Sequence, residues 1–140
     1  MFVRPGSSFH GLAHDVVKLY SMLLRNGVSA EGERILSGET VRMLTTRQHD
    51  GLLDETFGVV MDRVLGFFID SQRHSPAVPY GYGRAASHLT LGHGGKESST
   101  GFADPERGLA VALVFNVMPG EPKHDRRLKQ VFGAVHEAVG

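Results

Sequence analysis

The chain of 140 residues has no cysteine, no net charge and no long apolar run. Without cysteine there is no disulfide and no thiolate metal site. The cysteine content therefore does not indicate whether the protein works in an oxidising or a reducing compartment. Basic and acidic residues number 15 each, which argues against nucleic acid or an anionic membrane as a partner. A membrane-spanning helix or a signal peptide would need an apolar stretch that the sequence lacks. We therefore expect a soluble, cytoplasmic protein.

The composition is that of a globular domain, with 41% hydrophobic and 21% charged residues. Three segments have the apolar periodicity or end signals of helices. The first is predicted over Ala13–Asn26, before Gly27, and the second from Ser37 as N-cap to about Thr46, with Val41 and either Met43 or Leu44 buried. The third is predicted over Lys123–Val139, with an apolar face on the sheet.

The remaining segments indicate strands and loops. Residues 71–86 are rich in proline and glycine and predict a loop. The sequence Asp104-Pro105-Glu106-Arg107-Gly108 is typical of the turn of a β-hairpin. Strands are predicted over Leu65–Ile69, Ser87–Leu91, Ser98–Ala103 and Leu109–Phe115. The predicted order is helices, then a meandering antiparallel sheet, then one helix. This order indicates the α+β class.

The triplet His93-Gly94-Gly95 closes an apolar run and precedes the hairpin. Two glycines at a strand end let a backbone approach a ligand closely. A histidine beside them supplies a group for hydrogen bonding or proton transfer. Neither Ser-x-x-Lys nor Gly-x-Ser-x-Gly occurs in the chain, so the triplet indicates half of a serine-hydrolase site without its nucleophile.

Two separated segments carry a resemblance to a known family. One is Gly92–Gly95 followed by Gly101–Ala110, and the other runs from Ala13–Leu19 through Leu36–Leu44. Together they resemble the serine β-lactamase-related family, which includes class C β-lactamases, penicillin-binding proteins and related esterases. The resemblance implies that the antiparallel sheet, its C-terminal helix and the N-terminal helices form the C-terminal part of the β-lactamase/transpeptidase-like fold.

That family uses three motifs, and only the third is found here, as His93-Gly94-Gly95. The four lysines are preceded three places back by aspartate, histidine, glycine and arginine, never by the nucleophilic serine. Neither asparagine has tyrosine or serine two places before it, as the second motif requires. We therefore expect residues 1–140 to be a single partial domain, with a helical segment at 1–50, a strand and loop at 51–86, and antiparallel strands with a helix at 87–140.

The resemblance implies site residues. His93 and Lys96 are the expected catalytic residues, because the Lys96 N–H would be one oxyanion donor and His93 would contact the substrate or the proton network. Gly94, Gly95 and Tyr82 are expected to bind substrate. Histidine is less cationic than lysine at neutral pH, which favours ester or amide substrates over anionic penicillins. Lys96 and Glu97 depart from the family's small residues there. We expect no cofactor and no metal.

Two hypotheses follow for function. The chain is either the C-terminal part of a hydrolase that acts on a small ester, amide or β-lactam once a nucleophile-bearing segment completes it, or a non-catalytic remnant or interaction module. In the family that the chain resembles, the strand matching Leu109–Phe115 pairs with N-terminal strands, so without them the apolar strand over Ala110–Phe115 would leave an open sheet edge. We therefore expect a homo-oligomer or poor stability.

Overall fold

The computed structural model describes residues 11–79, 81–95 and 98–139. Helix α1 covers Ala13–Leu24 and α2 covers Gly38–Thr45. The strands are β1 (His49–Asp54), β2 (Val59–Arg63), β3 (Phe68–Ile69), β4 (Leu91–Gly94), β5 (Ser99–Asp104) and β6 (Leu109–Val114). Helix α3, over Glu121–Val139, follows the sheet. None of these helices is both long and apolar enough to cross a membrane.

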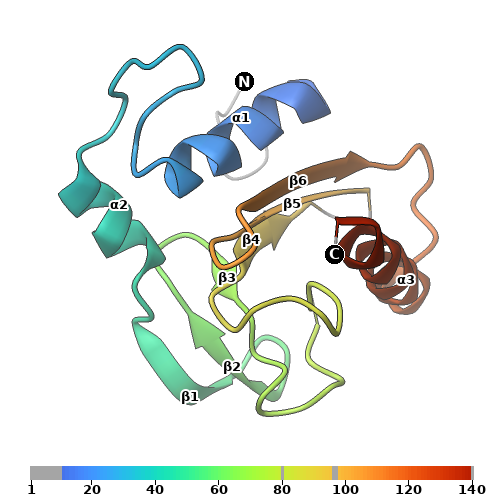
Figure 1. The fold of residues 1–140 in the computed structure, drawn as a ribbon. Helices are drawn as coiled ribbons and strands as arrows, with labels where there is room; N and C mark the ends of the chain where they lie inside the picture. The colour runs from blue at the N-terminus through green and yellow to red at the C-terminus, as the bar shows by residue number, and fades with distance from the viewer. Residues whose placement is uncertain (1–10, 80, 96–97, 140) are drawn as a thin grey trace, which may run out of the picture.

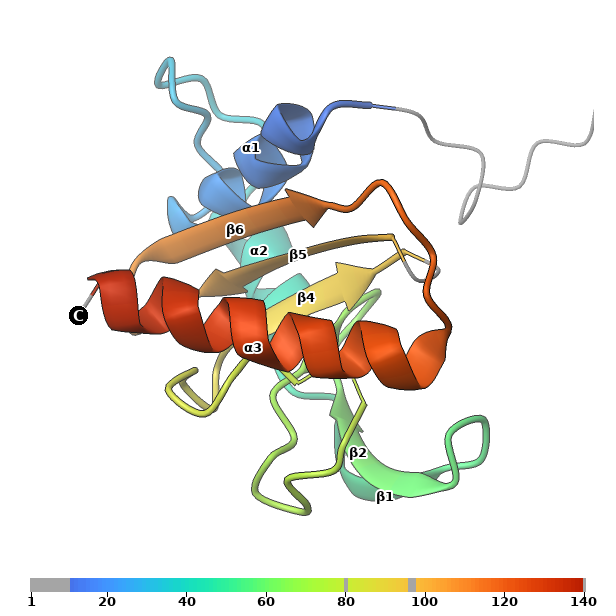
Figure 2. The same ribbon diagram turned by 90° about the vertical axis from the view of Figure 1, so that its right-hand side faces the viewer.

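The six strands form one antiparallel sheet in the order of the sequence, β1-β2-β3-β4-β5-β6. Helices α1 and α3 cover opposite faces of its β4–β6 part, and the β1–β2 hairpin projects away from them (Figures 1 and 2). The chain is therefore an α+β protein with an antiparallel sheet, N-terminal helices and a packed C-terminal helix, as the sequence predicts.

The core divides between the two faces of this sheet. On the α1 face, Tyr20 and Leu23 pack with Leu91 and Ala103. On the α3 face, Leu128 and Phe132 pack with other apolar side chains, among them Tyr82, Phe102 and Val111. Phe102 and Ala103 are adjacent on β5 and serve opposite faces, because successive side chains of a strand alternate. These layers hold β4 in the middle of the sheet.

The predicted N-cap of the second helix agrees with the structure, whereas α1 ends at Leu24 rather than Asn26 and α3 begins at Glu121 rather than Lys123. Ser37 caps α2, with its Oγ accepting a hydrogen bond from the Thr40 N–H at 3.0 Å. Val41 is buried and Leu44 is partly buried, whereas Met43 is exposed. The β5–β6 turn is also confirmed: Asp104 Oδ1 accepts from the backbone of residues 106 and 107.

The strand predicted over Ser87–Leu91 is wrong in its bounds. Residues 87–90 form a turn, in which the Thr90 N–H donates to the Ser87 carbonyl at 3.0 Å, and β4 begins at Leu91. The Asp104 carboxylate fixes this turn by accepting from the Ser87 N–H and hydroxyl at 2.9 and 2.7 Å. Hydrogen bonds from polar side chains therefore take the place of the β-strand pairing that the sequence predicts for residues 87–90.

Candidate active site at the end of strand β4

Strand β4 is paired unequally on its two sides. Strand β5 pairs with all four of its residues, from Leu91 to Gly94. Strand β3 pairs only with Leu91 and Gly92. Within the described part of the chain, His93 and Gly94 thus have no strand partner on the β3 side. The second half of β4 presents backbone groups at an open edge.

The His93 side chain is exposed at this edge. Its Nδ1 lies 2.7 Å from the Gly94 carbonyl oxygen, and its ring centroid lies 5.1 Å from that of Phe68. Because a carbonyl only accepts, Nδ1 must carry the proton in this contact. A neutral His93 ring then has its lone pair on Nε2, the atom that can accept a proton or a hydrogen bond from a ligand.

Tyr20 of α1 meets the backbone of the same strand. The His93 N–H donates to the Tyr20 Oη at 3.1 Å. Burial raises the pKa of Tyr20 to about 12, and the hydrogen bond from His93 opposes that rise. The hydroxyl stays protonated at neutral pH and retains its own proton for donation. Tyr20 therefore fixes the position of β4 at His93.

Gly101 gives the Tyr20 ring its space. On β5 it lies opposite His93, and an added Cβ would come within 2.4 Å of Tyr20 Cε2 and 3.1 Å of Val16 Cγ1. Contacts this short cannot be accommodated unless the Tyr20 ring, α1 or β5 moves. Glycine at residue 101 thus permits the contact between Tyr20 and His93.

The glycines after His93 continue into the β4–β5 connection. The Gly95 N–H donates to the Ser99 carbonyl at 2.7 Å, and a Cβ on Gly95 would come within 2.2 Å of Ser99 Oγ. Gly94 is half-buried at the open edge. Lys96, whose N–H is the expected oxyanion donor, lies outside the described residues. The structure therefore describes this strand end only as far as Gly95, the residue before that donor.

A cavity of about 80 Å³ adjoins this strand end on the α1 side. His93 and Ser99 contribute to its lining, together with Val16 of α1 and Ala112 of β6. Its walls are mostly apolar, and a cavity of this size admits only a small group.

Tyr82 lies in the core rather than at the rim of a pocket. Its side chain is 2% exposed and packs against Phe102 and Phe132, with ring centroids 5.4 and 6.3 Å away. Its hydroxyl donates to the Phe68 carbonyl at 3.2 Å, and burial raises its pKa well above the usual range. This position differs from the substrate-binding position that we expect from the sequence. Tyr82 instead supports β3, the strand beside β4.

The sheet also carries a cluster of acidic and basic groups around Asp62 of β2. Asp62 is fully buried, and its Oδ1 accepts from the Gly51 N–H at 2.7 Å and lies 2.9 Å from His74 Nε2. Its Oδ2 accepts from Arg73 Nε at 3.0 Å and forms a second ion pair with Arg47. The carboxylate therefore ties β2 to three other segments of the chain.

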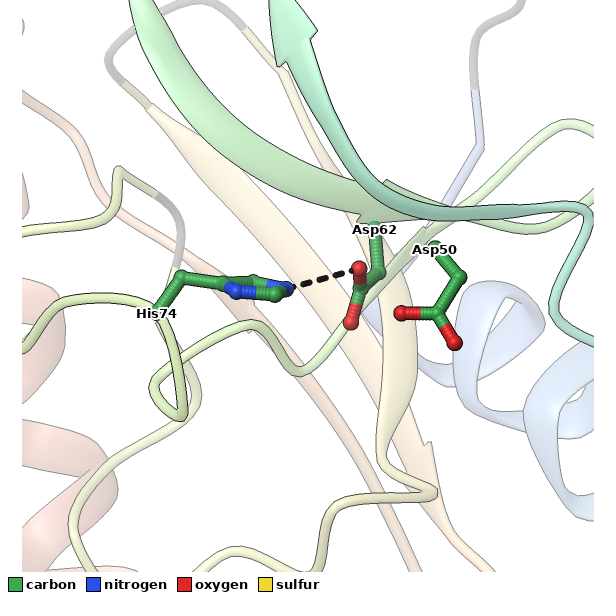
Figure 3. Close-up of side chains that lie close together, drawn as sticks. All are labelled: Asp50, Asp62 and His74. Atoms are coloured by element: carbon green, nitrogen blue, oxygen red, sulfur yellow. Dashed lines mark hydrogen bonds and ion pairs between the residues drawn. The ribbon is translucent and has the colours of Figure 1, made fainter.

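Asp50, Asp62 and His74 have ligand atoms within 4.8 Å of one another, the spacing of a candidate metal site (Figure 3). Asp50, however, pairs with Arg73, which also pairs with Asp62. A cation bound to Asp62 would have to displace two guanidinium groups. These residues fit a structural ion-pair network, in which paired charges compensate burial, better than a metal site.

The β-lactamase family profile matches residues 2–136. The chain belongs to the β-lactamase family. The antiparallel sheet between helices, with a His-Gly-Gly strand end, is thus a serine hydrolase-like fold. No curated protein matches the chain significantly in sequence.

Solved structures of longer proteins resemble this β-lactamase-family chain. A family VIII carboxylesterase is 28% identical, with a TM-score of 0.61 over 86% of this chain and 30% of that one. EstA from Arthrobacter nitroguajacolicus is 26% identical, with a TM-score of 0.65 over 90% and 31%. A β-lactamase from Mycobacterium bovis is 25% identical, with a TM-score of 0.61 over 84% and 40%. The chain spans 30 to 40% of the length of these relatives.

The sequence of this family member indicates only part of what surrounds His93. The triplet at 93–95 is found from its place at the end of an apolar run and from the family resemblance. Tyr20 is predicted as one apolar residue of a helix face, but its contact with His93 spans 73 residues, and nothing in local spacing signals it. The burial of Asp62 likewise depends on partners from other segments of the chain, Arg47 and Arg73.

Proposed function

We propose that this chain is the C-terminal part of a serine hydrolase of the β-lactamase family. It supplies the His93–Gly95 strand, while the nucleophile comes from another segment of polypeptide. The single observation that carries the proposal is the open edge of β4 at His93 and Gly94, where pairing with β3 has stopped. A substrate lying along this edge would meet the Gly94 backbone and the exposed His93 ring instead of a neighbouring strand, whereas the His93 and Gly95 N–H groups already donate to Tyr20 and Ser99.

The chemistry assigned to the completed site is acyl transfer. A serine of the second segment attacks the carbonyl carbon, the oxygen gains negative charge, and N–H donors stabilise that charge. By resemblance, the Lys96 N–H is one donor. The His93 ring offers Nε2 to the substrate or to the proton network, since Nδ1 is held by the Gly94 carbonyl. The acyl-enzyme then forms with loss of the alcohol or amine, and water releases the acid.

We propose neutral esters or amides as the substrates. Two of the relatives are named carboxylesterase and EstA, and a histidine in place of the motif's lysine holds an anionic carboxylate less firmly at neutral pH. A completed site should therefore hydrolyse p-nitrophenyl butyrate more efficiently than it hydrolyses benzylpenicillin. A higher kcat/KM for the penicillin would contradict this choice of substrate.

The experiment is complementation. The chain is produced alone and together with the Ser-x-x-Lys-bearing part of the family VIII carboxylesterase, cut before the region that matches this chain. We expect turnover of p-nitrophenyl butyrate only from the mixture, and at least a tenfold loss in His93→Ala. His88→Ala is the matched control, because His88 is also exposed but lies on the turn before β4. Turnover that survives His93→Ala would overturn the role of this strand.

A second function, an oligomerising interaction module, is supported by the edge strand β6. Strand β6 pairs only with β5 among the described strands, and it contains no charged residue or proline. Charge, proline and bulges are the usual protections of a sheet edge. A two-fold antiparallel pairing centred on Val111 would place Leu109 opposite Leu113 and Ala110 opposite Ala112. It would keep each residue on its own face of a continuous sheet.

Sedimentation velocity tests this homo-oligomer. We expect a dimer whose fraction rises with protein concentration, and a lower fraction in Val114→Lys, which puts a charge at a site that is 64% exposed. Val117→Lys is the matched control, because Val117 is exposed but lies beyond the strand. A wild-type chain that sediments as a monomer at every concentration would contradict the module.

A further inference from the structure

A second and larger cavity, of about 330 Å³, lies between α3 and residues 72–85. These two segments lie together on the side of the sheet away from α1 (Figures 1 and 2). We call it the α3 cavity. It does not include His93 or any other residue of the β4 strand end. Its size is that of a pocket for a small organic molecule.

Gly133 lies in the α3 wall of this cavity. Lys129, Gly133 and Glu137 follow one another at four-residue spacing on α3, and all three line the cavity. Glycine is unfavourable in a helix interior. A Cβ at Gly133 would meet no atom within 4 Å, so packing does not require glycine there. Its absent side chain instead leaves space between two charged residues.

Gly83, on the opposite wall, is glycine for a different reason. Its φ is +94°, and a Cβ would lie 3.2 Å from the Phe132 backbone. The segment therefore packs tightly against α3 at Gly83 and stands away from it at Gly133. This combination gives a cavity with a fixed wall rather than a gap between loosely packed segments.

The charged groups at the cavity favour an anion. Lys129 pairs with Asp125 at 2.8 Å, and the Gln72 amide is held by Asp70 and by the Gly83 carbonyl, each at 2.8 Å. Arg84 is exposed, and none of the ion pairs between described residues includes it. Its guanidinium can bind a carboxylate through two parallel hydrogen bonds.

We propose that the α3 cavity binds a small, mostly apolar molecule that carries one carboxylate. The carboxylate pairs with Arg84, and the apolar part fills the hollow over Gly133. Glu137 also lines the cavity and disfavours a second negative charge, so we expect dicarboxylates to bind more weakly. This site is separate from the proposed acyl-transfer site and does not depend on it.

The probes are 3-phenylpropanoate and its neutral analogue 3-phenylpropanamide, followed by the backbone amide signals of the 140-residue chain. We expect the carboxylate to bind at least tenfold more tightly than the amide and to shift the signals of Gly83 and Gly133. Arg84→Gln should make the two affinities equal. Failure of the carboxylate to bind at about 10 mM, where even a millimolar Kd gives near saturation, would overturn the proposal.

A variant that fills the cavity distinguishes loss of binding at this site from loss of folding. Gly133→Leu should abolish binding while the melting temperature stays the same or rises, because a helix interior prefers leucine. Ala134→Leu is the matched control, since Ala134 is exposed on the same helix and does not line the cavity. It should bind as the wild type does. Unchanged binding in Gly133→Leu would show that the ligand lies elsewhere.

Discussion

Replacing Gly101 with alanine should destabilise the chain through Tyr20. The new Cβ would come within 2.4 Å of Tyr20 Cε2, so the ring or the strand must move. Overpacking of this kind costs about 1–3 kcal/mol. The movement should also break the hydrogen bond from the His93 N–H to the Tyr20 hydroxyl, because that contact depends on the ring position. Urea denaturation followed by circular dichroism measures the loss.

A double-mutant cycle identifies the cause. Tyr20→Leu removes the ring atoms that the new Cβ would meet, so Gly101→Ala should cost little in that background. The coupling should then be about 1–3 kcal/mol, whereas independent sites add to within about 0.5 kcal/mol. Gly133→Ala is the glycine-to-alanine control, since its Cβ meets nothing, and should stabilise the chain by up to about 1 kcal/mol. Additive effects of Gly101→Ala and Tyr20→Leu would refute the reasoning.

Three further outcomes are expected. Asp62→Ala should cost about 3–5 kcal/mol in urea denaturation, because it leaves the partner charges of a buried carboxylate uncompensated; a loss below about 1 kcal/mol would contradict the ion-pair network. Burial raises the pKa of Asp70, more than the hydrogen bonds from Gln72 lower it, so the charged form costs stability as the pH rises through that pKa. Asp70→Asn should therefore be more stable than the wild type at pH 7, and the difference should be lost as the pH falls to about 4, the unfolded-state pKa; an equal difference at both pH values would argue against this assignment. Tyr20→Phe should speed hydrogen exchange at the His93 amide by about fivefold, as expected for the loss of one hydrogen bond of about 1 kcal/mol, and unchanged exchange would mean that the hydroxyl does not hold the strand.

The elements with regular apolar spacing are predictable from the sequence. Helices α1 and α3 follow from their 3.6-residue periodicity, and the β5–β6 hairpin follows from its Asp-Pro turn. The β1–β2 hairpin is not predictable in this way. Five of the six residues of β1 are exposed, so the strand lacks the alternation of a half-buried strand. Its position is set instead by Asp62 and its partners from distant segments.

The candidate site also contains residues that the sequence predicts and residues that it does not. Residues 93–95 are identifiable because glycine and histidine at a strand end carry chemical meaning on their own. The sequence predicts that Tyr82 binds substrate, because its neighbours are typical of a loop at the edge of a pocket. The loop that carries it turns inward and buries the ring against Phe102 and Phe132. Contacts between segments far apart in the chain decide such positions, and a single sequence does not contain them.

The central claim is that the open end of β4 belongs to a hydrolase site whose nucleophile lies on another segment. Labelling with a fluorophosphonate, followed by peptide mass spectrometry, tests it most directly. With the complementing carboxylesterase segment present, the adduct should form on the serine of that segment's Ser-x-x-Lys motif, and this chain should stay unmodified. An adduct on a serine of this chain, formed without any second segment, would contradict the claim.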